Sequence, residues 1–269
     1  MKLGFIGTGN LASAILRGVA ASETINTSEI LIFDINEAKA AQLSEELSVC
    51  AAKSAKEVAA ECENIIIAVK PKDFAALADE IKEEVKARNP LVISTAAGTE
   101  TSKIASCFGF DLKAVRIMPN INAAAGEAMT AICATDSVSY SEKEFVFSLC
   151  ETFGKAVFLE EKYFSAFTAI AGSGPAFAYI FADALATAGI KYGIPAKVSQ
   201  DIAAQMMLGS AKMLLESGLS VSELVRNVSS PGGTTVEGVC SLKKTGFENS
   251  VITAVDKTVA KDKAMSAGK

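Results

Sequence analysis

A glycine-rich turn follows the first apolar run of the chain, where the segment Leu3–Ile6 leads into Gly7-Thr8-Gly9-Asn10-Leu11-Ala12. Gly7 permits a tight turn, Gly9 lets a ligand approach the backbone, and Ala12 keeps the following helix close to the strand. The backbone N–H groups and the positive dipole end at such a helix start bind phosphate groups. Strand, turn and helix together predict a dinucleotide site. The alternative is an ordinary glycine turn.

An acidic residue, Asp34, ends the predicted strand Ile30–Phe33 and lies 22 positions after Ala12. An acidic side chain about 20 residues beyond the glycine turn accepts hydrogen bonds from the adenosine ribose in dinucleotide-binding folds. Its charge would repel the extra phosphate of NADP(H), so taken alone it favours NAD(H). Lys39 is near enough in sequence to soften that repulsion. The alternative is that Asp34 only caps the helix that follows.

Three later strands end in segments that could line one crevice. They are Ala68-Val69-Lys70-Pro71, Ser94-Thr95-Ala96-Ala97-Gly98 and Met118-Pro119-Asn120. Ligands of open α/β sheets bind beyond the carboxyl ends of the strands, and small residues there let a flat ring approach the backbone. Each segment alone could be an ordinary turn, and Lys70 could be a surface lysine.

The most specific segment of the chain is Ser229-Ser230-Pro231-Gly232-Gly233-Thr234-Thr235. Its Pro-Gly-Gly turn and the capping-box spacing of Thr234 and Glu237 predict the start of a helix. The N–H groups of that start could hold a substrate carboxylate and leave the Thr235 hydroxyl free to bond a reacting atom. A helix start without a ligand explains the segment equally well.

Composition narrows the chemistry further. The 269 residues include no histidine and carry a formal net charge of −5. The lack of histidine excludes histidine-based zinc sites, Ser-His triads and imidazole acids, and we expect no metal site. Six cysteines without C-x-x-C spacing indicate buried, reduced thiols. The chain has no block of basic residues, so we do not expect it to bind nucleic acid. Because a predicted strand begins the chain, we expect no leader peptide and a cytoplasmic location.

The elements that must position these segments fall into two parts. Residues 1–159 alternate short apolar runs with helical segments, which predicts a doubly wound α/β domain with a parallel sheet. The predicted strands are Leu3–Ile6, Ile30–Phe33, Ile65–Val69, Leu91–Ser94, Val115–Met118, Met129–Cys133 and Ala156–Leu159. Residues 160–269 show helical periodicity only and predict a second, all-helical domain.

The first helix predicted in the second part, Phe164–Ile190, is apolar on nearly every side. Its length and hydropathy would allow a membrane span. Gly172, Gly174, Pro175 and Asp183 inside it, and the lack of a basic flank, favour a buried helix and no membrane. A helix without a polar face must bury its apolar side chains, and so small a domain offers too few partners for them. We therefore infer that the helix forms an interface in an oligomer.

Taken together, these segments resemble the pyrroline-5-carboxylate reductases, the enzymes that complete proline biosynthesis. The resemblance spans the chain and rests on GFIGTGNLA at 4–12, AVKP at 68–71, STAAG at 94–98, MPN at 118–120, AGSGPAFAY at 171–179 and SSPGGTT at 229–235. It implies a Rossmann domain, an all-α dimerisation domain, and dimers that commonly assemble into decamers. The implied reaction is the reduction of (S)-1-pyrroline-5-carboxylate to L-proline with NADPH or NADH.

The resemblance also implies roles for single residues. The pyrophosphate of the cofactor would lie on Ile6, Gly7, Thr8, Gly9, Asn10 and Leu11, with Asp34 at the adenosine ribose. The nicotinamide side would be lined by Ala68, Val69, Lys70, Pro71, Ala96 and Ala97. The substrate would meet Ser230, Gly233, Thr234 and Thr235, with the Thr235 hydroxyl near the imine nitrogen as the candidate catalytic group. A protonated cyclic imine accepts hydride without a strong protein acid, which suits a chain without histidine.

Three positions depart from the family pattern. Ile121-Asn122 follow MPN where the family often has Thr-Pro, and Ala55 replaces an asparagine that touches the adenosine part of the cofactor in many members. The main alternative is a β-hydroxyacid dehydrogenase of the same clan, which needs a lysine base on the helical domain. Lys191, Lys197 and Lys212 are available there, without a matching motif. A non-catalytic dinucleotide sensor is a further alternative.

Overall fold

The structure is a computed structural model and describes residues 2–22 and 24–266. By compactness the chain divides into two units. The first is formed by residues 1–172 and 259–269, and the second by residues 173–258. The domain boundary that the sequence predicts after residue 159 stays a prediction.

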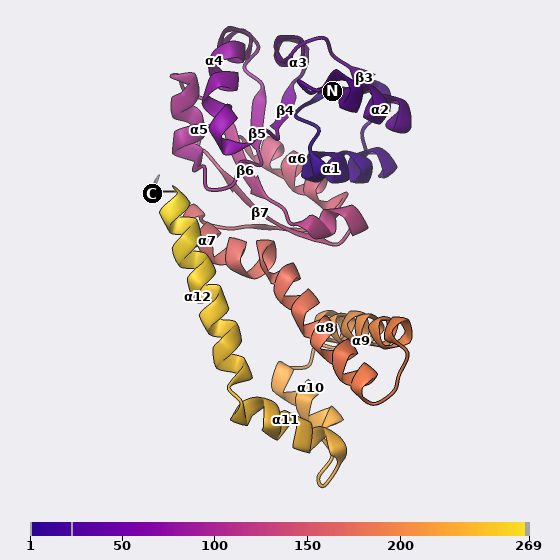
Figure 1. Cartoon of the computed structure of the whole chain (residues 1–269). Helices are drawn as coiled ribbons and strands as arrows, with labels where there is room; N and C mark the ends of the chain where they lie inside the picture. Colours follow the sequence, from indigo (N-terminus) through magenta and orange to yellow (C-terminus); the bar gives the residue numbers. More distant parts are fainter. Residues whose placement is uncertain (1, 23, 267–269) are drawn as a thin grey trace. The chain divides into compact units, whose positions relative to one another are not determined.

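The first unit is built on a sheet that contains, within the described residues, eight strands in the order β3-β2-β1-β4-β5-β6-β7-β8 (Figure 1). They are β1 (Leu3–Ile6), β2 (Ile30–Phe33), β3 (Cys50–Ala51), β4 (Asn64–Ile67), β5 (Leu91–Ser94), β6 (Ala114–Met118), β7 (Ala128–Ala134) and β8 (Gly154–Phe158). Neighbours from β3 to β6 pair in parallel. The predicted doubly wound α/β architecture is confirmed.

The sheet differs from the prediction at β7, which is antiparallel to β6, and at β8, which is parallel to β7. The connection from β6 to β7 holds only a short 3₁₀ turn, η2 (Ile121–Ala125). A parallel return would need a crossover of about a dozen residues or more, so this connection reverses the chain. The two-residue strand β3 was also not predicted, because so short a run carries no periodic signal.

Helices cover both faces of this sheet, and alternate strand residues face each side. One side carries α1 (Asn10–Ala21), α2 (Glu37–Leu47) and α6 (Tyr140–Glu151), and the other carries α3 (Ala55–Glu61), α4 (Pro71–Arg88) and α5 (Thr101–Phe108). On β4, Ile66 belongs to the first core, whereas Ile65 and Ile67 belong to the second. Burial on both faces explains the continuous apolar run of this strand.

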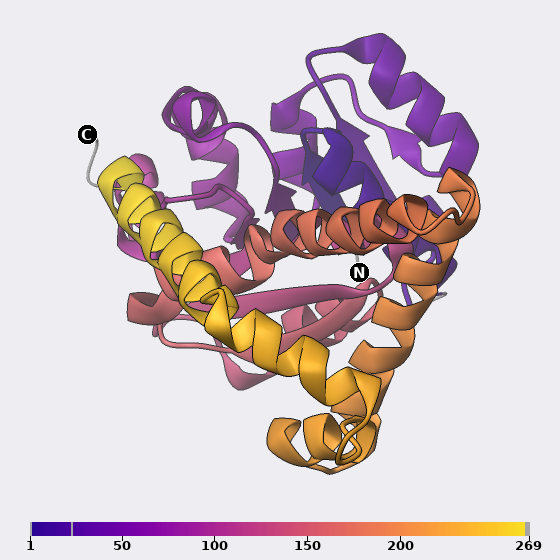
Figure 2. The same cartoon turned by 60° about the horizontal axis from the view of Figure 1, so that its bottom comes forward.

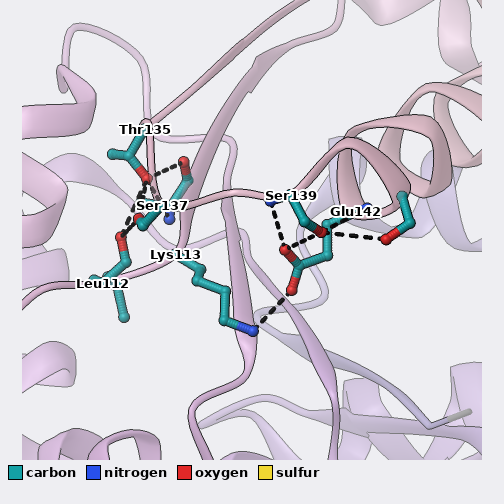
Figure 3. A network of polar contacts seen from close by, with 8 residues as sticks. Leu112, Lys113, Thr135, Ser137, Ser139 and Glu142 are labelled. Carbon is teal, nitrogen blue, oxygen red and sulfur yellow. Dashed lines mark hydrogen bonds and ion pairs between the residues drawn. The ribbon is translucent and has the colours of Figure 1, made fainter.

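A polar network holds together the amino-terminal end of β6, the end of β7 and the start of α6 (Figure 3). Lys113 Nζ lies 2.8 Å from Glu142 Oε1. Glu142 also accepts hydrogen bonds from the backbone N–H and the hydroxyl of Ser139, which forms a capping box for α6. The Thr135 hydroxyl donates to the Leu112 carbonyl at 3.2 Å. Because these groups lie at the edge of the sheet opposite the carboxyl ends of the parallel strands, we assign them to folding.

The second unit contains helices joined by turns, and no strand, in its residues 173–258, as predicted (Figure 2). It contains α8 (Gly174–Lys191), α9 (Ala196–Glu216), α10 (Val221–Val228), α11 (Thr234–Lys244) and the first part of α12 (Phe247–Ser266). α8 and α9 pack side by side. The rings of Phe181 and Phe247 lie 5.7 Å apart between their centroids, which joins α8 to the start of α12.

The predicted apolar helix at 164–190 is helical but interrupted. It consists of α7 (Phe164–Phe167), a π-helical turn labelled η4 (Thr168–Gly172), and α8. Within the described residues, 161–191 is the one segment long and apolar enough to cross a membrane, and only 11% of its apolar window is buried. Tyr179 is 62% and Ile180 70% exposed. The expected burial of this segment is therefore not achieved within the described residues of a single chain.

Candidate active site

The ends of four parallel strands lie side by side in the first unit. The last residues of these strands pair in register. They are Phe33 of β2, Ile6 of β1, Ile67 of β4 and Ser94 of β5. The residues that follow them along the same edge are Asp34, Gly7, Ala68 and Thr95. Backbone bonds continue the register, from Gly7 N to the Phe33 oxygen at 2.8 Å and from Ala68 N to the Ile6 oxygen at 2.8 Å. The structure thus brings the predicted cofactor segments together at one edge.

The glycine turn between β1 and α1 has the geometry of a phosphate cradle. Gly7 has φ of +97°, and a Cβ there would lie 2.7 Å from the Ala68 carbonyl oxygen. Gly9 is the N-cap of α1 without a side-chain capping bond, and a Cβ there would meet no atom within 4 Å. No acidic residue occupies the first turn. The N–H groups of Asn10 and Leu11 lie in the first turn at this positive helix end, which fits a dinucleotide pyrophosphate.

The Asp34 carboxylate binds back to this turn. Its Oδ2 accepts from Thr8 N at 2.6 Å and from the Thr8 hydroxyl at 2.9 Å, and its Oδ1 accepts from Asn36 N at 2.9 Å. Burial alone would raise the pKa of Asp34, but the three hydrogen bonds and the nearby Lys39 charge lower it below its ordinary value. The N-cap of α2 is Asn36, whose side chain accepts from Lys39 N. Asp34 is therefore not the cap of that helix.

The next two strand ends differ in what they expose. Lys70 is the extended N-cap of α4 with Pro71 in its first turn, and its side chain is exposed. After β5, Ala96 is 3% exposed and belongs to the core, whereas Ala97 is exposed. Val69 is half-buried. A ligand at this edge would therefore meet the side chain of Ala97 but mainly the backbone of Ala96.

After β6, Asn120 is 7% exposed and donates from Nδ2 to the Ala171 carbonyl in the π-helical turn at 2.8 Å. Among the described residues, its Oδ1 is buried without a hydrogen-bond partner, and so is the hydroxyl of Thr168 in that turn. The sequence placed Asn120 at a strand end but gave no signal for this long-range bond. π-helical turns occur often at functional sites.

Sequence reasoning also missed a buried ion pair. Arg116 is 4% exposed, its Nη1 lies 3.0 Å from Glu161 Oε1, and its guanidinium lies over the Phe164 ring at 4.4 Å from the centroid. Glu161 also accepts from the backbone N–H and the hydroxyl of Thr101 at 2.9 and 2.7 Å, which caps the start of α5. A single arginine within an apolar strand was the available signal, because such a charge is rarely buried unless paired.

The predicted substrate segment forms a tight turn and a helix start in the second unit. Gly233 N donates to the Ser230 carbonyl at 3.0 Å, and Gly232 has φ of +70°. With Pro231 before that glycine, this is the pattern of a type II turn. Helix α11 begins at Thr234 as predicted. The capping box is wrong, however, because the turn makes Gly233 the N-cap, which lacks a side chain.

This arrangement leaves donors free at the start of α11. The N-cap makes no side-chain hydrogen bond, and Thr235 is half-buried. The structure gives the Thr235 hydroxyl no hydrogen-bond partner among the described residues. Ser230 and Thr234 are exposed on the same turn. A helix start with free N–H groups and an unpaired hydroxyl can bind a small carboxylate and direct one hydrogen bond to an adjacent atom.

The six cysteines are free thiols that differ in exposure. Cys62 and Cys150 are buried as predicted, and burial raises the pKa of Cys62 to about 12. The expectation of burial is wrong for Cys50 and Cys240, which are exposed. Across residues 2–22 and 24–266, no three His, Cys, Asp or Glu side chains are grouped to hold a metal ion.

Comparisons with known proteins cover both units. The family profile described as "Pyrroline-5-carboxylate reductase dimerisation" matches residues 161–265, and that described as "NADP oxidoreductase coenzyme F420-dependent" matches residues 2–98. The pyrroline-5-carboxylate reductase of Aquifex aeolicus is 35% identical over 265 residues, which cover 98% of this chain and 97% of that protein. The enzyme of the same name from Escherichia coli is 36% identical, with 98% of each chain covered.

A solved structure extends this similarity to three dimensions. The crystal structure of Plasmodium falciparum pyrroline carboxylate reductase with NADP bound matches with a TM-score of 0.88 at 31% identity. The match covers 99% of this chain and 98% of that chain. The similarity in sequence and in fold therefore extends over both units. The chain belongs to the pyrroline-5-carboxylate reductase family.

Proposed function

We propose that this chain reduces (S)-1-pyrroline-5-carboxylate to L-proline with NADPH or NADH. The observation that carries the proposal is the uncapped start of α11 with its unpaired Thr235 hydroxyl. It occurs in a chain that also has an open phosphate cradle at Gly9 and that is 35% identical over its length to a relative of that name. The nicotinamide cofactor supplies a hydride when it is bound.

The first unit holds the cofactor. The N–H groups after Gly9 bind the pyrophosphate, and the Asp34 carboxylate binds the adenosine ribose. The small residues that follow β4 and β5 leave room for a flat ring against the backbone. The cofactor residues in this proposal are Ile6, Gly7, Thr8, Gly9, Asn10, Leu11, Asp34, Ala68, Val69, Lys70, Pro71, Ala96 and Ala97.

The second unit holds the substrate. The free N–H groups at the start of α11 bind the substrate carboxylate, with Ser230, Gly233 and Thr234 forming the turn around it. The Thr235 hydroxyl donates to, or accepts from, the ring nitrogen and so fixes the face that the imine carbon presents. Thr235 orients the reacting ring, and the protonated imine itself provides the electrophile.

The chain works as a homo-oligomer whose unit is a dimer. The dimerisation profile over residues 161–265 and the exposed apolar side chains of α8 support this. Because a second copy would cover these side chains, the apolar segment needs no membrane. Assembly of dimers into decamers and a cytoplasmic location complete the proposal.

The test is oxidation of NADH and of NADPH by the purified full-length protein, followed by nicotinamide absorbance, with and without pyrroline-5-carboxylate. We expect oxidation that depends on the imine and formation of proline in equal amount. A parallel arm offers NAD⁺ or NADP⁺ with β-hydroxy acids. Turnover of a hydroxy acid together with none of the imine would replace this proposal with the dehydrogenase alternative. No turnover of either, with nucleotide binding intact, would indicate a non-catalytic sensor.

A further inference from the structure

The carboxylate of Asp34 is almost fully used by the protein itself. An ionised carboxylate offers about four acceptor positions. Thr8 N and the Thr8 hydroxyl occupy Oδ2, and Asn36 N occupies one position of Oδ1. The geometry therefore leaves about one acceptor position, on Oδ1, for a ligand. This free acceptor position can receive a hydrogen bond from a ribose hydroxyl. It cannot form one with an ionised phosphate, because a phosphate has only acceptor oxygens.

The same bonds keep this carboxylate charged and in place. Thr8 is 1% exposed, so its two donors are held by the packing of the turn. Burial opposes ionisation of Asp34, but the hydrogen bonds from Asn36 and Thr8 outweigh it and lower the pKa. The side chain can neither turn away from a bound nucleotide without breaking these bonds nor become neutral at ordinary pH.

The positive charge that acts on Asp34 comes from Lys39, which helps to lower its pKa. Glu37 occupies the first turn of α2 and adds a negative charge. Lys39 is the cation nearest in sequence; it is exposed, and its Nζ forms no ion pair within the described residues. Arg17 on α1 is already bound to Glu46 by two hydrogen bonds of 2.6 and 2.9 Å.

We propose, on the basis of the proposed reductase function, that this chain prefers NADH to NADPH, with Asp34 as the specificity-determining residue and Thr8 as the residue that positions it. The family relative from Plasmodium falciparum was crystallised with NADP bound, so the preference is a property of this chain rather than one carried over. A doubly charged phosphate in contact with one carboxylate loses about 30-fold in affinity at the dielectric constant of water. We therefore expect NADH to bind about 30-fold more tightly at low ionic strength.

The test is calorimetric titration of the full-length wild-type protein with NADH and with NADPH, in the absence of substrate. The variant is Asp34→Asn, which keeps the shape and an acceptor for Thr8 N but removes the charge. It should bind NADPH more tightly and NADH no more tightly than the wild type, so the ratio falls by about tenfold or more. The matched control is Asp79→Asn, an exposed residue of α4 that makes the same change in net charge. Its ratio should equal that of the wild type.

Thr8→Val tests the positioning role, because valine keeps the volume and the backbone donor but lacks the hydroxyl. The wild-type preference for NADH should become smaller, with little change in the thermal unfolding midpoint. An unchanged ratio would remove Thr8 from the inference. Lys39→Gln should leave the ratio unchanged, and selective loss of NADPH binding would instead show that Lys39 receives the phosphate.

Failure of this inference is separable from failure of the proposed function. Equal or tighter binding of NADPH by the wild type would overturn the preference, and imine reduction with NADPH would leave the reductase proposal standing. The same holds if Asp34→Asn changes both affinities equally. Binding of neither nucleotide would overturn both. Because the wild-type ratio is itself a test, a variant that fails to fold does not rescue the inference.

Discussion

Replacing Glu161 with alanine should destabilise the first unit by about 3–5 kcal/mol, because it leaves a buried guanidinium without its counter-charge. The Arg116 side chain is 5% exposed and lies 3.0 Å from Glu161 Oε1. The variant also removes the acceptors for Thr101, whose backbone N–H and hydroxyl bond to Glu161 at 2.9 and 2.7 Å. The helix start of α5 therefore loses its cap in the same substitution.

The reverse replacement, Arg116→Met, should cost less, about 1–3 kcal/mol. Glu161 is 22% exposed in its side chain, so water reaches it, and it keeps both Thr101 donors. What is lost is one charged hydrogen bond and the contact of the guanidinium with the Phe164 ring at 4.4 Å. The asymmetry between the two variants is the specific prediction, since it follows from which partner is buried.

The assay is urea unfolding followed by far-ultraviolet circular dichroism at one fixed protein concentration, because oligomerisation makes apparent stability depend on concentration. The control is Glu61→Ala, which breaks the exposed ion pair with Lys2 (2.6 Å; side chains 45% and 44% exposed) and should not change the midpoint measurably. A smaller loss for Glu161→Ala than for Arg116→Met would refute the reasoning. So would losses for both that match the control.

Three further results are expected. Thr235→Val should leave the fold and NADH affinity intact but lower kcat by about 30- to 1,000-fold, equivalent to about 2–4 kcal/mol of barrier. Thr235→Ser should keep most of the rate. Wild-type turnover by the valine variant would show that the hydroxyl has no part in the mechanism. Gly7→Ala should lower the thermal unfolding midpoint and weaken NADH binding in titration, because φ of Gly7 is +97° and the new Cβ would lie 2.7 Å from the Ala68 carbonyl oxygen. Normal NADH binding would contradict the assigned turn. Burial opposes the charge of Glu142, but hydrogen bonds from Lys113 and Ser139 outweigh it and lower the pKa below the ordinary 4.5. The stabilisation by Glu142 is thus present above pH 4.5 and is lost as the pH falls through the pKa of the folded state. The difference in unfolding free energy between wild type and Glu142→Gln should therefore shrink in acid. A difference that does not depend on pH would argue against this stabilising role of Glu142.

Much of the first unit could be predicted from sequence because its signals are local. The run at 65–67 alternates between two cores and is apolar throughout, as a strand covered on both faces must be. The spacing of Gly7 and Gly9 after an apolar run indicated a turn that the positive φ of Gly7 bears out. The roles of single residues in binding and catalysis were inferred from residue spacing and from resemblance, and they stay proposals.

Other features of the fold depended on contacts that local sequence patterns do not predict. The reversal at β7 follows from a connection too short for a crossover, and strand periodicity is the same in both directions. The N-cap of α11 is Gly233 rather than Thr234, because a turn closed between Ser230 and Gly233 places the cap one residue earlier, while the helix still begins at Thr234. A capping-box spacing cannot register such a shift.

The sequence by itself determined the alternation of strands and helices in the first unit, the glycine turn, the family, and a chemistry without histidine, because each depends on residue type and spacing along the chain. Only the tertiary structure decided that Asp34 binds Thr8, that Arg116 is buried against Glu161, and that Asn120 holds the π-helical turn. These contacts join segments far apart in sequence. Their energies arise from distance, burial and hydrogen-bond geometry, which exist only once the chain has folded.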